Sequence, residues 1–173
     1  MTVLKKAFGT ALLSGILLVS SACKKTPTNT AFEAEEPTII VLCHPDSEAT
    51  DAFITAAIFV QGNAKEMRVF GLDISFDPQM LHFEEVRNGT LTGGWTAVDG
   101  NEVSPGSLKV GGFMGAGNPI PLESGGTVAE IRFKVAGGDY SSGQQSKVCA
   151  LQYTDDLSDF RPDSACANFI LKK

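Results

Sequence analysis

The chain has 173 residues, with 14 Lys or Arg against 20 Asp or Glu, so its formal net charge at pH 7 is −6. Proteins that bind nucleic acid neutralise phosphates with basic side chains, and an acidic chain is a poor match for that function. The length is sufficient for one hydrophobic core but not comfortably for two. We therefore expect one domain that does not bind nucleic acid.

The N-terminus resembles a bacterial lipoprotein signal. Lys5 and Lys6 precede an apolar run, residues 7–19, which is too short to cross a membrane as a helix. Small residues follow and end at Cys23, the position at which a lipobox carries the cysteine that receives the lipid. An ordinary cleaved signal peptide followed by an unmodified cysteine is the alternative. We interpret residues 1–22 as a signal peptide and Cys23 as the lipidation site. This predicts an extracytoplasmic protein anchored to the bacterial cell membrane, inner or outer.

Residues 23–37 are predicted to form a lipid-anchored polar tether. The segment 24–37, KKTPTNTAFEAEEP, contains two prolines and no apolar periodicity. A flexible chain of this length spans about 20 Å between its ends. The tether would therefore keep the following domain close to the membrane.

Residues 38–173 have the pattern of an all-β domain. Short alternating or β-branched runs are separated by Gly, Pro, Asn and Asp, and no segment has the length and periodicity of an amphipathic helix. The predicted strands are residues 38–43, 52–60, 67–76, 81–86, 107–114, 127–135, 147–153 and 166–171, with a ninth at 95–103. This pattern predicts an eight- to nine-stranded antiparallel β-sandwich, similar to a jelly roll.

The stretch from Val69 to Phe83, VFGLDISFDPQMLHF, is the most specific part of this pattern. Its even-numbered residues 70–76 are all large and apolar, whereas the intervening positions are mostly small or polar, as in a strand with one buried face. Asp77-Pro78 then ends the strand, because proline has no N–H for the ladder and the aspartate side chain favours a turn. The run resembles the strand-DP-x-x-L signature of cohesins, the β-sandwich modules that bind dockerins in cellulosomes.

Two further stretches extend the resemblance over most of residues 38–171. Residues 106–135 follow the order of the second half of cohesins: a strand, a Gly- and Pro-rich crossing and a strand that ends in an apolar-x-Phe-Lys-Val pattern at Ile131 to Val135. Residues 52–62, AFITAAIFVQG, resemble the cohesin strand that precedes the Asp-Pro strand. The resemblance implies a cohesin-like sandwich whose partner is an exported protein with a dockerin-like module.

The expected binding residues depart from those of well-known cohesins. Many cohesins carry an Asn and an Asp on the outward face of the Asp-Pro strand, where Val69 and Gly71 stand here. Neither residue offers a side-chain hydrogen bond. The outward groups expected on the face that cohesins use are Asp73, Ser75, Gly111, Glu130, Arg132 and Lys134. They form either a different partner-binding face or an ordinary solvated surface.

Catalysis finds little support in the sequence, and we expect a binding protein rather than an enzyme, with no cofactor. The two histidines are His44 and His82, and His44 directly follows Cys43. In a strand, the side chains of these two neighbours would point to opposite faces, so a Cys-His dyad would be hard to form. Known motifs for serine hydrolases, zinc proteases and phosphate-binding loops are missing from the sequence.

Three cysteines remain beside Cys23, an odd number for an oxidising compartment. We predict a disulfide between Cys149 and Cys166, which flank an excursion between two predicted strands. Pairing of Cys43 with either of them is the competing prediction, because the first and last strands of a cohesin sandwich lie side by side.

Two other features suggest ligands. Asp155, Asp156, Asp159 and Asp163 form a weak calcium candidate, although their spacing is not that of an EF-hand and a polar loop explains them equally well. Trp95, in a Gly- and Thr-rich segment, is either a sugar contact or a core residue.

The sequence thus predicts a membrane-anchored, cohesin-like module that attaches a dockerin-like partner, and the resemblance to cohesins suggests a role in polysaccharide degradation. A carbohydrate-binding surface module is the first alternative, with a polysaccharide as its partner. A structural envelope lipoprotein is the second.

Overall fold

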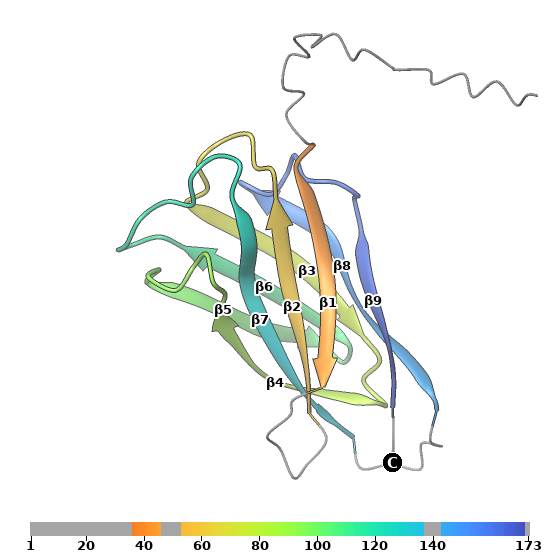
Figure 1. The fold of residues 1–173 in the computed structure, drawn as a ribbon. Coiled ribbons are helices and arrows are strands. Elements are labelled where there is room, and N and C mark those ends of the chain that lie inside the picture. Colours follow the sequence, from red (N-terminus) through yellow and green to blue (C-terminus); the bar gives the residue numbers. More distant parts are fainter. Residues whose placement is uncertain (1–35, 46–52, 137–142, 172–173) are drawn as a thin grey trace, which may run out of the picture. The chain divides into compact units, whose positions relative to one another are not determined.

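The computed structural model describes residues 36–45, 53–136 and 143–171 (Figure 1). The chain divides into two units, Met1–Glu33 and Ala34–Lys173, and every described residue belongs to the second. The predicted signal peptide, Cys23 and most of the tether lie outside the described residues. No helix among the described residues is long and apolar enough to cross a membrane.

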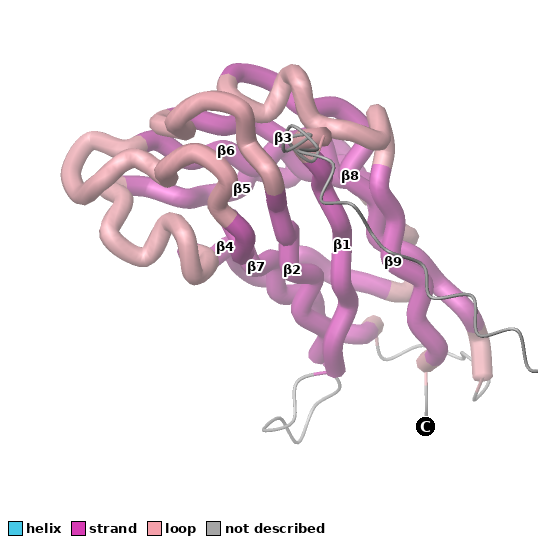
Figure 2. Tube along the Cα trace, turned by 45° about the horizontal axis from the view of Figure 1, so that its top comes forward, coloured by secondary structure: helices cyan, strands magenta, loops and turns pink. Residues whose placement is uncertain are grey.

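The described chain is a sandwich of two antiparallel sheets (Figures 1 and 2). The strands are β1 (Thr38–Pro45), β2 (Phe53–Gln61), β3 (Val69–Phe76), β4 (Leu81–Asn88), β5 (Ala97–Ser104), β6 (Ser107–Phe113), β7 (Gly125–Val135), β8 (Gln145–Asp155) and β9 (Ala165–Ile170). One sheet has the order β1-β2-β7-β4 and the other β5-β6-β3-β8-β9. The predicted all-β sandwich is confirmed, and all nine predicted strands are present with small shifts at their ends.

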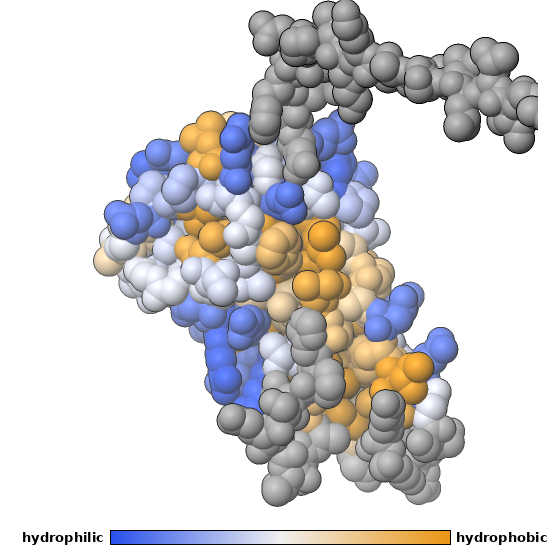
Figure 3. Space-filling model, in the orientation of Figure 1, coloured by the Kyte–Doolittle hydropathy of each residue, from blue (hydrophilic) through white to orange (hydrophobic). Residues whose placement is uncertain are grey.

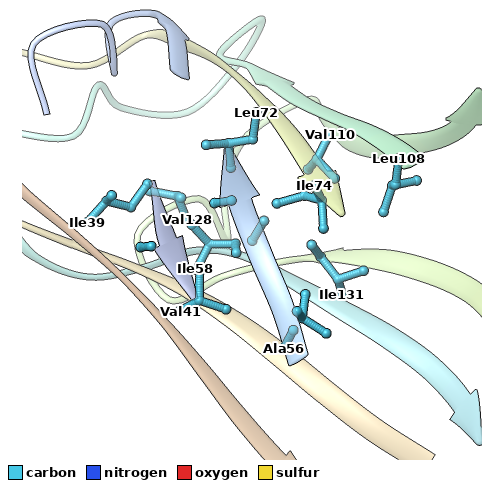
Figure 4. Packing of buried hydrophobic residues seen from close by; sticks show 14 of the residues in the cluster. Ile39, Val41, Ala56, Ile58, Leu72, Ile74, Leu108, Val110, Val128 and Ile131 are labelled. Atoms are coloured by element: carbon cyan, nitrogen blue, oxygen red, sulfur yellow. The ribbon is translucent and has the colours of Figure 1, made fainter. Parts of the chain in front are cut away.

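The core lies between the two sheets and is built by the strand alternation seen in the sequence. On β3, Phe70, Leu72 and Ile74 are at most 2% exposed. Leu72 and Ile74 pack in the same cluster as Ile58 and Ile131 from the other sheet (Figure 4). Burial of each such side chain contributes about 1.5–3 kcal/mol before the cost of ordering the chain. The inward halves of the strands therefore hold the two sheets together.

The predicted Asp-Pro stop ends β3 in the structure. The Asp77 side chain accepts a hydrogen bond from the Gln79 N–H at 2.9 Å through Oδ1. Its backbone carbonyl accepts from the Met80 and Leu81 N–H groups at 3.1 and 2.9 Å. These bonds turn the chain out of the five-stranded sheet, and β4 then joins the other sheet.

Candidate partner-binding face

The outer surface of the five-stranded sheet carries three of the six residues expected to bind a partner. The strand register aligns Gly71 with Gly111, Asp73 with Lys109 and Ser75 with Ser107 across β3 and β6. We call this surface the β3 face. Its central residues are Val69, Gly71, Asp73 and Ser75 of β3, Lys109, Gly111 and Phe113 of β6, and Gln152 and Thr154 of β8.

The other three expected residues do not lie on this face. Glu130, Arg132 and Lys134 belong to β7, which pairs with β2 and β4 in the four-stranded sheet. The expectation of one face containing all six residues is therefore wrong. Its physical cause is that strand alternation shows whether a side chain points inward or outward, whereas the sheet to which the strand belongs depends on long-range pairing.

The residues on β7 are part of a charged region on the outer side of the four-stranded sheet. The Arg132 guanidinium carbon lies 4.0 Å from the centroid of the Phe53 ring. Arg132 Nη1 also lies 3.7 Å from Glu85 Oε1 on the neighbouring β4. Figure 3 shows hydrophilic side chains over β4 and β7 and apolar ones over β1 and β2. The apolar part includes Ile40 and Leu42, each 41% exposed.

Two opposed glycines lie at the middle of the β3 face, and one of them leaves it flat. A Cβ added to Gly71 would lie 2.2 Å from Thr154 Oγ1, so the threonine side chain occupies the space above this glycine. A Cβ added to Gly111 would come no closer than 3.4 Å to the Phe70 carbonyl oxygen. Gly111 therefore leaves its backbone open to a partner, as expected from the sequence, whereas Gly71 is needed to seat Thr154.

Exposed apolar side chains lie at one end of the glycine floor. Val69 and Phe113 are directly opposite each other on β3 and β6 and are 38% and 51% exposed. A further exposed apolar residue, Leu151, 45% exposed, lies toward the other end, on β8 where the register with β3 shifts between Asp73 and Ile74. Aromatic and apolar side chains that stand free on a sheet surface are typical of interaction sites.

An ion pair lies at the other end of the floor. Lys109 Nζ and Asp73 Oδ1 are 2.7 Å apart, and both side chains are partly exposed. An exposed pair of this kind contributes at most about 1 kcal/mol to folding. Its two charges are therefore available to a partner at little cost to the fold.

Lys109 and Phe113 are functional candidates that the sequence interpretation missed. Leu108 and Val110 are buried on the same strand, so period-2 alternation places Lys109, Gly111 and Phe113 on the opposite, outward side. Alternation alone was therefore sufficient to find Lys109. Phe113 was missed because an apolar aromatic at the end of a strand is normally assigned to the core.

The four aspartates do not form the calcium site suggested by their density. Asp156 Oδ2 accepts hydrogen bonds from the backbone N–H groups of Arg68 and Val69 at 2.7 and 3.1 Å. Lys65 Nζ lies 3.8 Å from Asp156 and 3.7 Å from Asp159, and Arg161 pairs with Asp163 at 3.1 Å. The described part of the chain contains no group of three or more His, Cys, Asp or Glu that could hold a metal ion. The carboxylates of Asp156, Asp159 and Asp163 instead hold the start of β3 and the β8–β9 connection, whereas Asp155 is the last residue of β8.

Trp95 is a core residue and not a sugar contact. It is 7% exposed, and its ring centroid lies 5.8 Å from that of Phe70. Its indole Nε1–H donates a hydrogen bond to the Asn118 carbonyl at 3.1 Å. Of the two alternatives left open by the sequence, the structure therefore supports the core residue, because the indole is engaged in packing and in this hydrogen bond.

The structure contains the predicted disulfide between Cys149 and Cys166, with 4.0 Å between the two Cα atoms. The residues are directly opposite each other on β8 and β9. Cys43 is a free thiol, and burial raises its pKa from 9.0 to about 12. The competing pairings of Cys43 are therefore absent from the described structure.

Comparison with known proteins shows likeness at the level of fold. No family model and no curated protein matches the sequence, whereas 35 chains of known structure match the fold. One is the cohesin module of the family 33 glycoside hydrolase of Clostridium perfringens, with a TM-score of 0.56 and 12% identity over 79% of this chain and 96% of that one. Another is the sixth cohesin of scaffoldin B of Acetivibrio cellulolyticus, solved with a Cel5 dockerin, with a TM-score of 0.53 and 13% identity over 75% and 96%.

A third match is the cohesin of a type II cohesin–X-dockerin complex from Acetivibrio cellulolyticus, with a TM-score of 0.51 and 18% identity over 68% of this chain and 78% of that one. The domain is thus a cohesin-like β-sandwich. Cohesin modules are typically non-catalytic binding modules, and the matched modules include ones crystallised with dockerins.

Proposed function

We propose that this protein is a membrane-anchored, extracytoplasmic module that attaches a protein partner through the β3 face and has no catalytic role. The cohesin-like fold supports the class of function, because cohesins of the same architecture have been solved with dockerin partners. The residues of this chain support the location. The partner proposed is an exported protein with a dockerin-like module.

The observation that carries the proposal is the open backbone of Gly111 between two kinds of contact. Exposed Val69 and Phe113 lie on one side, and the Asp73–Lys109 ion pair lies on the other. A flat centre lets a partner approach the sheet closely, the apolar residues supply burial, and the charges fix the orientation. This combination distinguishes the β3 face from the outer side of the four-stranded sheet.

The mode of recognition differs from that of cohesins with Asn and Asp on the Asp-Pro strand. Here Val69 and Gly71 occupy those positions, so the polar contacts move to Asp73, Lys109 and Gln152. We expect a partner whose surface complements both signs of charge and the exposed Phe113 ring.

Membrane attachment through Cys23 is supported by the basic residues, the apolar run and the small residues before that cysteine. Metabolic labelling with a palmitate analogue tests it: the wild-type chain should be labelled and Cys23→Ser should not. Labelling of Cys23→Ser would contradict the anchor.

Binding of purified exported proteins that carry dockerin-like modules, measured by isothermal titration calorimetry, tests the partner. Lys109→Glu should weaken binding by about tenfold, because it places two like charges side by side at the contact. Arg87→Glu, a charge reversal on the other sheet, is the matched control and should leave affinity unchanged. Equal affinity in wild type and Lys109→Glu would move the site away from the β3 face.

A further inference from the structure

The five-stranded sheet has a step at its edge, where β8 and β9 continue beyond the end of β3. Pairing between β3 and β8 runs from Phe70 opposite Asp155 to Phe76 opposite Val148. β8 begins earlier, at Gln145, and its residues 145–147 pair only with β9 in the described sheet (Figure 1). About 10 Å of strand therefore has a neighbour on one side and none from β3 on the other.

The backbone groups that face this step can be assigned from the ladder. The Cα atoms of Cys149 and Cys166 are 4.0 Å apart, a separation typical of a non-hydrogen-bonded pair in an antiparallel ladder. Lys147 with Asn168 and Gln145 with Ile170 follow at intervals of two residues and belong to the same class. The N–H and C=O groups of Lys147 and Gln145 therefore point away from β9. They point toward the position that β3 would occupy if it continued past Phe76.

A cavity of about 460 Å³ lies at this step. It is lined by Ser75, Phe76, Asp77, Gln145, Ser146, Lys147 and Asn168. Asp77 is engaged by its own turn, through the hydrogen bond from Gln79. Lys147, in contrast, has no ion-pair partner among the described residues and is exposed. Among the described residues, the cavity therefore presents one available cation, Lys147, beside strand-edge groups that have no backbone partner.

Ser146, which also lines the cavity, has a buried hydroxyl. The residue as a whole is 9% exposed, and its hydroxyl oxygen is buried without a hydrogen-bond partner among the described residues. Buried hydroxyls are normally paired, because an unpaired one loses its bonds to water without replacement. Since Ser146 faces inward, like Val148, an inward-pointing hydroxyl on a strand added beside β8 is the group that would pair with it.

The disulfide holds the edge in place for binding. On the N-terminal side of Val148, β8 is paired with β9 alone among the described strands, and the inner face of this two-stranded ribbon packs on the core through Phe169 and Leu171. The bond between Cys149 and Cys166 lies at the position where the ribbon leaves β3. A ribbon fixed in this way costs less to order when a ligand binds.

We propose that an extended peptide segment of the partner adds to β8 at this step, with an acidic side chain opposite Lys147. The main chain of the peptide would pair with the N–H and C=O groups of Gln145 and Lys147, as in strand addition to a sheet edge. The chemistry favours a peptide over a glycan because Phe76, the one aromatic side chain among the described residues of the lining, is buried at 7% exposure and offers no stacking platform. This inference rests on the proposed function that the module binds a protein.

The test is a titration of the 15N-labelled full-length chain, in mild detergent, with three probes: acetyl-Val-Thr-Glu-Thr-Val-amide, the same peptide with Lys for Glu, and cellotetraose. The Glu peptide should shift the amide signals of residues 145–147 and slow hydrogen exchange at Lys147. The Lys peptide should bind about fivefold more weakly, because its charge repels Lys147. The inference would be overturned if cellotetraose alone shifted these signals. It would also be overturned if none of the three probes shifted them at millimolar concentration.

Two variants separate specific binding from a structural effect. Ser146→Ala removes a hydroxyl that has no internal partner, so the free chain should be as stable as wild type or more stable, while affinity for the Glu peptide falls about threefold. Lys147→Glu should reverse the preference between the Glu and Lys peptides. A Lys147→Glu chain that keeps the wild-type preference would contradict the placement of the acidic side chain.

The same variants distinguish this inference from the proposed function. If Lys109→Glu weakens binding of the whole partner, and Lys147→Glu and Ser146→Ala do not, the β3 face stands and the strand addition fails. If the Glu peptide binds at residues 145–147 and Lys109→Glu has no effect on the whole partner, strand addition stands and the proposed face fails.

Discussion

Cys149 and Cys166 face each other across β8 and β9, yet Cys149 is 2% exposed whereas Cys166 lies at the surface. Their bond closes a loop with a sequence separation of 17. Replacing both cysteines with alanine should lower the free energy of unfolding by about 3 kcal/mol, because the unfolded chain regains the entropy of that loop. Chemical denaturation checks this value.

Cys43→Ala is the control for the disulfide variant, since it removes a cysteine but keeps the bond. We expect it to cost less than half as much as the double replacement. Equal unfolding curves for the wild type and the double variant under oxidising conditions would show that the bond does not stabilise the native chain.

The two opposed glycines should respond differently to substitution. Gly71→Ala forces Thr154 to move, because the new Cβ would lie 2.2 Å from its Oγ1, and also disturbs the hydrogen bond from Thr154 to Asp155 at 3.0 Å. We expect a loss of about 1 kcal/mol in unfolding free energy. Gly111→Ala meets only the Phe70 carbonyl oxygen at 3.4 Å and should be tolerated.

Partner binding should show the opposite order. Gly111→Ala raises the open floor and should weaken binding more than it alters stability, as measured by calorimetry beside thermal unfolding. In Gly71→Ala, adding Thr154→Ala should recover part of the lost stability. Strict additivity of these two changes would contradict the predicted clash.

Trp95 should act as a structural residue. Trp95→Ala should cost about 3–5 kcal/mol of stability, because it empties a large core site next to Phe70. Trp95→Phe should cost less, since the hydrogen bond to Asn118 is lost but most of the packing stays. As the chain has one tryptophan, its fluorescence should be blue-shifted in the native state. A red-shifted native spectrum would contradict the buried indole.

The chain should lose stability at alkaline pH through two partly buried groups, Cys43 and Tyr153. Burial raises the pKa of the Cys43 thiol from 9.0 to about 12. Burial, together with the nearby Asp163 carboxylate, raises the pKa of Tyr153 from 10.0 to about 12. For both groups the unfolded chain releases its proton first, so their stabilising effect is complete below pH 9 and is lost as the pH rises toward 12.

Unfolding midpoints measured from pH 8 to pH 12 test this window. Combining Cys43→Ala with Tyr153→Phe should flatten the alkaline decline. The Cys43 thiol should also react slowly with a disulfide reagent at pH 8 in the native chain and rapidly in denaturant. Rapid native reaction would show that the thiol is not protected.

Removal of divalent cations should leave the thermal midpoint unchanged. Asp156 binds two backbone N–H groups and has Lys65 beside it, which leaves its carboxylate in a poor position to bind calcium. Asp156→Ala should lower stability by about 2 kcal/mol, since it leaves the N–H groups of Arg68 and Val69 without their acceptor. A lower thermal unfolding midpoint in EDTA would show that a metal ion binds and stabilises this end of the sandwich.

Much of the fold could be predicted from local pattern, and part of the site could not. The alternation in residues 69–76 and the Asp77-Pro78 stop define β3 and its buried face without any knowledge of the partner strands. The placement of Glu130 and Arg132 on the other sheet could not be read in this way, because β7 has the same alternation whichever sheet it joins. Trp95 shows a second limit, since its Gly- and Thr-rich surroundings resemble a surface loop, and the packing that buries the indole comes from distant β3.

The continuous pairing of β1 with β2, from Thr38 opposite Gln61 to Pro45 opposite Ile54, has a mechanical consequence. The chain enters the sandwich at the first residue of β1, so any tension from the N-terminal side acts first on this strand. A pull along the strand axis loads all the rungs of the ladder at once, in shear, instead of opening them one by one. Ile39 adds a further bond at the same end, from its N–H to the Arg161 carbonyl at 2.9 Å. A module attached through its N-terminus would therefore resist drag on its cargo with the full length of one strand.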